Sequence, residues 1–113
     1  YPKRKKPTEY KLPFLKDLIK GKHDIDVVLM AGGGGFNAVE EDAILMNKIC
    51  GHRIYENNAP YEQTKFPYAN KLRVIEKLEF AKVSYVILSV VDHDKVIREI
   101  VNSSDPKLVG LKY

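Results

Sequence analysis

An apolar run that ends in four consecutive glycines is the feature that most limits what this chain can fold into. Residues 27–31 have the apolar, β-branched composition of a buried strand, and residues 32–35 remove every Cβ from the segment that follows. The chain continues through Phe36 and Asn37 to an acidic first turn at Glu40 and an apolar pattern at helical spacing. This order predicts a strand, an exposed glycine loop that a flat or charged ligand can approach closely, and a helix from about Glu40 to Cys50.

The remaining pattern alternates helices and strands. A short helix is expected over residues 13–20, with Pro13 in its first turn and Gly21 as its stop signal, and another from Asn70 to about Ala81. Residues 83–91 are apolar throughout, which predicts a strand buried on both faces of a sheet. Further strands are expected at 95–101, after a turn at 92–94, and more weakly at 52–55, while 62–69 forms a loop or short strand. The pattern predicts an α/β fold, a small mixed β-sheet flanked by helices.

Composition and motifs favour a protein that is not an enzyme. The 113 residues, 44% hydrophobic and 30% charged, fit one globular domain. No apolar run approaches the roughly 18 residues of a membrane span, so we expect no membrane partner. The single cysteine, Cys50, favours a reducing compartment and a packed thiol. Phosphate-loop, serine-nucleophile and metal-ligand spacings are all missing, so no catalytic residue, cofactor or metal is expected.

Basic residues are concentrated at the start of the chain. The net charge is +4, and residues 1–9 form a basic leader that contains Lys3, Arg4, Lys5 and Lys6. Such an arm neutralises phosphates, although a solvated leader has the same composition. Arg53 and Lys65 lie near aromatic residues suited to stacking on bases, or equally to packing at a sheet edge, and these aromatics are Tyr55, Tyr61, Phe66 and Tyr68.

Several segments resemble the N-terminal domain of MutS-type mismatch repair proteins. Residues 14–18, 26–30 and 33–43 resemble the opening helix, the strand that ends in a Gly-Asp-Phe-Tyr-Glu-like motif, and the acidic start of the next helix. Residues 66–69 resemble an apolar-Pro-Tyr-His segment, with Ala69 in place of the histidine, and 71–90 and 98–101 resemble the later helix and strands. The resemblance covers residues 12–105 and implies a MutS-like domain over 10–105 and an extension over 106–113. Because the sequence does not begin with Met, we expect further domains of a longer parent protein as candidate partners.

In that family an aromatic wedge and a Glu two residues later contact the mispaired base. In the gapless alignment these positions fall on Gly35 and Asn37; a one-residue slip places Phe36 on the wedge and Ala38 on the Glu. The pair is incomplete in either register. The resemblance therefore implies a DNA-binding module without mismatch reading, with a cytoplasmic, nucleoid-associated location, or a nuclear one in a eukaryote. It would contact double-stranded or branched DNA through Gly34, Gly35, Phe36, Asn37, Lys3, Arg4, Lys5, Lys6, Arg53 and Lys65. The alternative is a protein-interaction or scaffold domain that keeps the fold but does not bind DNA.

Overall fold

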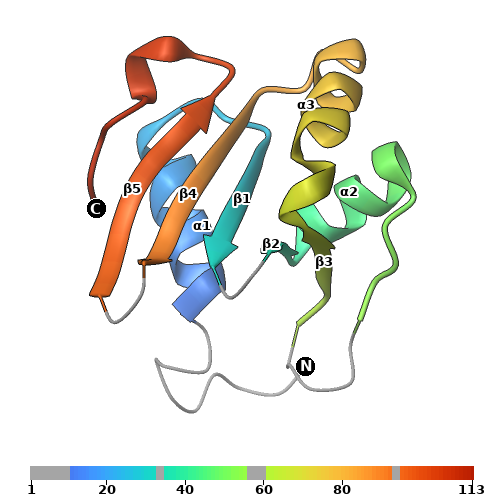
Figure 1. Ribbon diagram of the computed structural model, residues 1–113, viewed down its shortest axis with the longest axis horizontal. Coiled ribbons are helices and arrows are strands. Elements are labelled where there is room, and N and C mark those ends of the chain that lie inside the picture. Colours follow the sequence, from blue (N-terminus) through green and yellow to red (C-terminus); the bar gives the residue numbers. More distant parts are fainter. Residues whose placement is uncertain (1–10, 33–34, 56–60, 93–94) are drawn as a thin grey trace.

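The computed structural model describes residues 11–32, 35–55, 61–92 and 95–113, and its helices and strands alternate along the chain (Figure 1). The described chain begins with helix α1 (Lys11–Lys22), and its last helical element is the short 3-10 turn η3 (Pro106–Leu108). The elements between them are β1 (Val27–Gly32), β2 (Gly35–Val39), α2 (Glu41–Cys50), β3 (Gln63–Pro67), the 3-10 turn η2 (Tyr68–Asn70), α3 (Lys71–Phe80), β4 (Tyr85–Asp92) and β5 (Lys95–Ser103).

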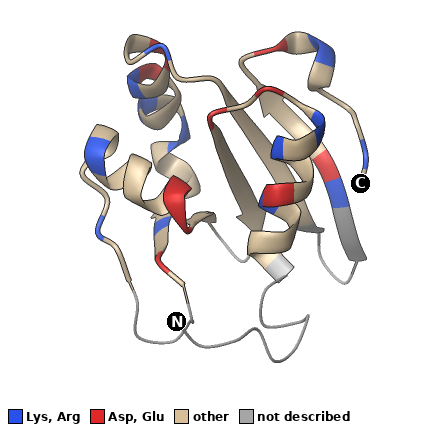
Figure 2. Cartoon of the chain, turned by 180° about the vertical axis from the view of Figure 1, so that it is seen from behind, with Lys and Arg blue, Asp and Glu red and all other residues tan. Residues whose placement is uncertain are grey.

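The strands form one five-stranded sheet in the order β3-β2-β1-β4-β5. β1 and β4 are parallel, and the other three neighbouring pairs are antiparallel. The predicted α/β fold with a small mixed sheet is therefore confirmed. Helix α1 lies behind β4 in Figure 1 and in front of the sheet in the reverse view of Figure 2, whereas α2 and α3 cover the opposite face.

The central strands β1 and β4 are buried on both faces, as their continuous apolar sequences predict. Val28 and Met30 pack with Leu15 and Ile19 of α1. The intervening β1 residues, Val27 and Leu29, pack with residues of α2 and α3, namely Met46, Val74 and Leu78. Because successive side chains of a strand point to opposite faces, two separate apolar clusters form on one sheet.

The predicted glycine loop is wrong in part, because its second half is strand β2. Gly35 pairs with Gly32 and Asn37 with Met30, so that β1 and β2 form an antiparallel hairpin. Only residues 33 and 34 separate the two strands, and they lie outside the described residues. Because the preceding residues are glycines, the sequence did not reveal that burial alternates along residues 35–39, with Phe36 and Ala38 buried on one face.

Other boundaries also differ from the sequence prediction. α1 continues through Gly21 to Lys22, since Gly21 adopts no left-handed conformation that would end the helix. Residues 52–55 are not a strand: Tyr55 alone forms an isolated bridge, to Gln63. The ambiguous segment 62–69 contains strand β3, and β5 extends beyond the expected residue 101 to Ser103. The expected turn at 92–94 includes positions outside the described residues.

Candidate nucleic-acid interface

The hairpin end brings together four of the residues predicted to bind nucleic acid. Gly35, Phe36, Asn37 and Lys65 line a shallow pocket of about 440 Å³, and its other lining residues are Gly32, Phe66 and Pro67. Five other predicted site residues lie outside the described part of the chain, namely Gly34, Lys3, Arg4, Lys5 and Lys6.

One face of the β2–β3 pair carries polar side chains. Asn37 lies directly opposite Lys65, and the Gln63 side-chain amide donates a hydrogen bond to Asn37 Oδ1 at 3.3 Å. Lys65 is exposed, and Asn37 and Gln63 are half-buried. The apolar cluster beneath α1 includes Val39 of β2 but no described residue of β3. We call Asn37, Gln63 and Lys65 the polar face.

Phe36 points to the other face, so the expectation of an exposed aromatic at this position is wrong. Its side chain is 3% exposed. The ring stacks on Phe66 with centroids 5.1 Å apart, and Tyr68 contacts it edge-on at 4.8 Å. A wedge must enter the base stack, which this buried ring cannot do without leaving the core.

Gly35 has a structural role in the pairing of β2 with β3. A Cβ at this position would lie 2.6 Å from the backbone carbonyl oxygen of Phe66, closer than real Cβ atoms approach. This glycine therefore permits close contact between two strands. The sequence interpretation, which took the glycines as space for a ligand, missed this reason.

The side chains of Arg53 and Tyr55 are exposed and therefore accessible to a ligand. The Arg53 guanidinium lies 5.4 Å from the centroid of the Tyr55 ring, and the Tyr55 backbone pairs with Gln63 at the edge of β3. Tyr55 and Tyr68 are each 45% exposed, whereas the other two aromatics proposed to stack on bases, Tyr61 and Phe66, are buried.

Two lysines of α1, Lys16 and Lys20, form ion pairs within the protein. Lys16 is 1% exposed, and its Nζ contacts Glu41 and lies 2.9 Å from Glu40 Oε1. Lys20 pairs with Asp42, a fully buried carboxylate that also accepts a hydrogen bond from the backbone N–H of Val28 at 3.0 Å. These contacts tie α1 to the start of α2, so neither lysine is positioned to neutralise a phosphate.

Burial raises the pKa of Asp42, although the hydrogen bonds from Lys20 and the Val28 backbone and the charges of Lys20 and Lys16 oppose this shift. Asp42 is therefore a structural carboxylate whose desolvation is only partly offset by its partners. In the reverse view of Figure 2, acidic and basic residues are mixed along the helices.

The residues with metal-binding or nucleophilic chemistry have structural partners. Carboxylate oxygens of Asp17, Glu40 and Glu41 lie within 4.8 Å of one another. The Lys16 ammonium contacts all three and occupies the position that a metal cation would take. Cys50 is half-buried against the α2/α3 cluster, as predicted for a packed thiol, and burial raises its pKa. A raised pKa keeps the thiol protonated and disfavours nucleophilic attack.

No protein-family model matches this sequence, and no curated protein matches it. Among the described helices, none combines the length and apolar character needed to cross a membrane. The candidate site is therefore defined by the geometry of β2 and β3.

One residue of the polar face, Gln63, was not predicted from the sequence, because its place beside Asn37 follows from the β2–β3 pairing. The alternation of polar and apolar residues in 35–39 and 63–66 was the available signal.

Proposed function

We propose that this chain is a DNA-binding module that contacts the duplex backbone through the polar face and does not read mismatches. The observation that supports this proposal is the clustering of Asn37, Gln63 and Lys65 on one side of β2–β3, beside the glycine hairpin. An ammonium group neutralises phosphate, and side-chain amides donate hydrogen bonds to phosphate oxygens. The resemblance of residues 12–105 to the MutS N-terminal domain supports the same class of partner.

The spacing of the family motif supports a module that does not read mismatches. Residues two apart on a strand share a face, so an aromatic wedge and its Glu partner both face the DNA. Here the corresponding positions are Gly35 and Asn37, and a side chain at Gly35 would collide with the Phe66 carbonyl. Phe36 lies between them and points into the core, and exposing a buried Phe side chain costs about 1.5–3 kcal/mol.

The test is fluorescence anisotropy with matched, mismatched and branched duplexes at two salt concentrations. All three duplexes should bind with similar affinity at low salt, and binding should weaken steeply as salt rises because counterions are released. Lys65→Glu should reduce affinity at least about tenfold and lower the salt slope by about 0.9 for each phosphate that is no longer neutralised.

The matched control is Lys107→Glu, which makes the same charge change at an exposed lysine of η3, away from β2 and β3. It should retain most of the wild-type affinity. Equal losses in the two variants would show that net charge, and not the polar face, governs binding. Failure of all three duplexes to bind at low salt would reject DNA binding and favour the protein-interaction alternative.

A further inference from the structure

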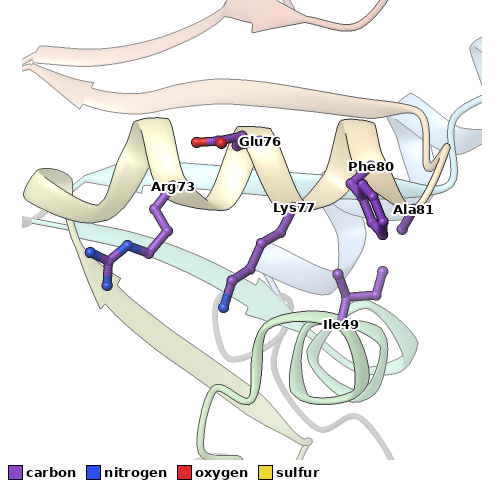
Figure 3. A pocket seen from close by; sticks show the side chains of 6 residues that line it. All are labelled: Ile49, Arg73, Glu76, Lys77, Phe80 and Ala81. Carbon is purple, nitrogen blue, oxygen red and sulfur yellow. The ribbon is translucent and has the colours of Figure 1, made fainter.

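A groove lies between α2 and α3 (Figure 3), the helices that cover the side of the sheet opposite the polar face. It has a volume of about 750 Å³ and is lined by Ile49 of α2 and by Arg73, Glu76, Lys77, Phe80 and Ala81. Phe80 is 92% exposed, so its ring contributes almost nothing to the folded core. The Phe80 and Ile49 side chains face each other at one end of the groove and form its apolar part.

Two basic side chains form the charged part of the groove. Arg73 and Lys77 are four residues apart, one helical turn, and both extend from α3 on the side of α2, whereas the Glu76 carboxylate points elsewhere (Figure 3). Within the described chain, no carboxylate lies within the 4.0 Å ion-pair distance of either cation. The two charges are therefore available to an external acid.

The positive potential of Lys77 extends to the α2 side of the groove. Burial raises the pKa of the Cys50 thiol and lowers that of His52, and the Lys77 charge acts on both groups. The Cys50 thiol therefore stays protonated near neutral pH and places no negative charge beside Lys77, and the His52 ring is neutral there.

We propose that the α2/α3 groove docks an acidic peptide segment of a partner protein. A large apolar side chain of the peptide packs between Ile49 and Phe80, and carboxylates beside it pair with Arg73 and Lys77. At a rise of about 1.5 Å per residue, Arg73 and Phe80 are about 10 Å apart along α3, the length of about three residues of extended peptide. By the same measure Lys77 is about 4.5 Å from Phe80, so the peptide carries its acids about one to three residues from its apolar anchor.

The charge distribution of α3 favours a peptide over a nucleic acid. Glu76 and Glu79 are exposed on the same helix and repel a polyanion that lies across it. A narrow peptide meets chiefly Arg73 and Lys77, and its apolar side chain fills the space beside Phe80, which a phosphate backbone does not fill. The proposal depends on α2 and α3 alone and is independent of DNA binding at the polar face.

The test is selection from a displayed library of random short peptides on the intact chain. Enriched sequences should combine a large apolar residue with nearby Asp or Glu. A synthetic peptide of the enriched sequence should shift the backbone amide resonances of Ile49, Lys77 and Phe80. Phe80→Ala and Lys77→Glu should each weaken its binding about tenfold, because each removes one principal interaction with the peptide.

The controls are Leu72→Ala, an exposed apolar residue of α3 outside the groove, and Lys107→Glu, which matches the charge change. Both should bind the peptide as the wild type does. The proposal is overturned if no sequence is enriched, if enriched sequences lack acids, or if they bind Phe80→Ala and Lys77→Glu normally. It is likewise overturned if a DNA duplex, in place of a peptide, shifts the same three resonances.

Discussion

The two faces of the β2–β3 pair have opposite chemistry, although the same two five-residue strands form both. On one face Phe36, Ala38, Thr64 and Phe66 are all buried beneath α2 and α3. On the other face Asn37 and Gln63 are half-buried and Lys65 is exposed. One face stabilises the fold, and the other carries accessible hydrogen-bonding groups.

This difference shows how strongly strand register determines which side chains are exposed in a small sheet. Because side chains alternate between faces, a slip of one residue would exchange the two sets. Phe36 would then lie on the polar face in a position to act as a wedge. Asn37 would enter the core, where no hydrogen bond would compensate for burying its side-chain amide. The buried stack of Phe36 on Phe66 stabilises the register that excludes a wedge.

The largest expected effect comes from removing the aromatic ring on the buried face. Phe36→Ala should lower the free energy of unfolding by about 3–5 kcal/mol, because it deletes a buried Phe and leaves a cavity beside Phe66. Chemical denaturation measures this loss.

The matched control for Phe36→Ala is Phe80→Ala, which removes a ring that is 92% exposed and should change stability by no more than about 0.5 kcal/mol. Similar small effects in both variants would mean that Phe36 is exposed, and the wedge interpretation would then return. A weakened DNA affinity of Phe36→Ala alone is not evidence for a wedge, since the variant loses stability.

A smaller effect is expected where the two strands approach each other closely. Gly35→Ala should destabilise the protein by about 1–3 kcal/mol, because the new Cβ collides with the Phe66 carbonyl and shifts β2 against β3. Gly21→Ala is the control: this exposed helical glycine has no atom within 4 Å of the added Cβ, so alanine should stabilise α1 by about 0.5–1 kcal/mol. Changes of the same sign in the two variants would contradict the close-contact role of Gly35.

The sequence predicted the parts of the fold that depend on local pattern. The continuous apolar residues of β1 and β4 and the periodicity of α3 were sufficient to place the sheet and its helices. Strand β2 was missed because glycine has low strand propensity, and only its pairing with Met30 and Lys65 orders residues 35–39. The orientation of Phe36 followed from that same pairing. The buried state of Lys16 also could not be predicted, since two of its three acidic partners, Glu40 and Glu41, lie 24 and 25 residues away.

The smallest effect is a pH dependence at the boundary of the buried face. The His52 ring stacks on Phe66 with centroids 4.6 Å apart, and in the described structure its buried Nδ1 has no hydrogen-bond partner. Burial, with a further contribution from the Lys77 charge, lowers its pKa below the ordinary value of 6.5. Below about pH 6.5 the unfolded chain binds a proton that the folded protein resists, so the free energy of unfolding should fall as pH decreases from there toward the lower folded-state pKa.

His52→Phe keeps an aromatic ring on Phe66 but cannot be protonated, so it should lose this component of the pH dependence. The measurement is the difference in free energy of unfolding between wild type and His52→Phe, from urea titrations at several values between about pH 5 and about pH 8. The difference should favour the variant increasingly at lower pH. A difference that stays constant over this interval would place the imidazole in solvent, and the buried face of β2–β3 would then end at Phe66.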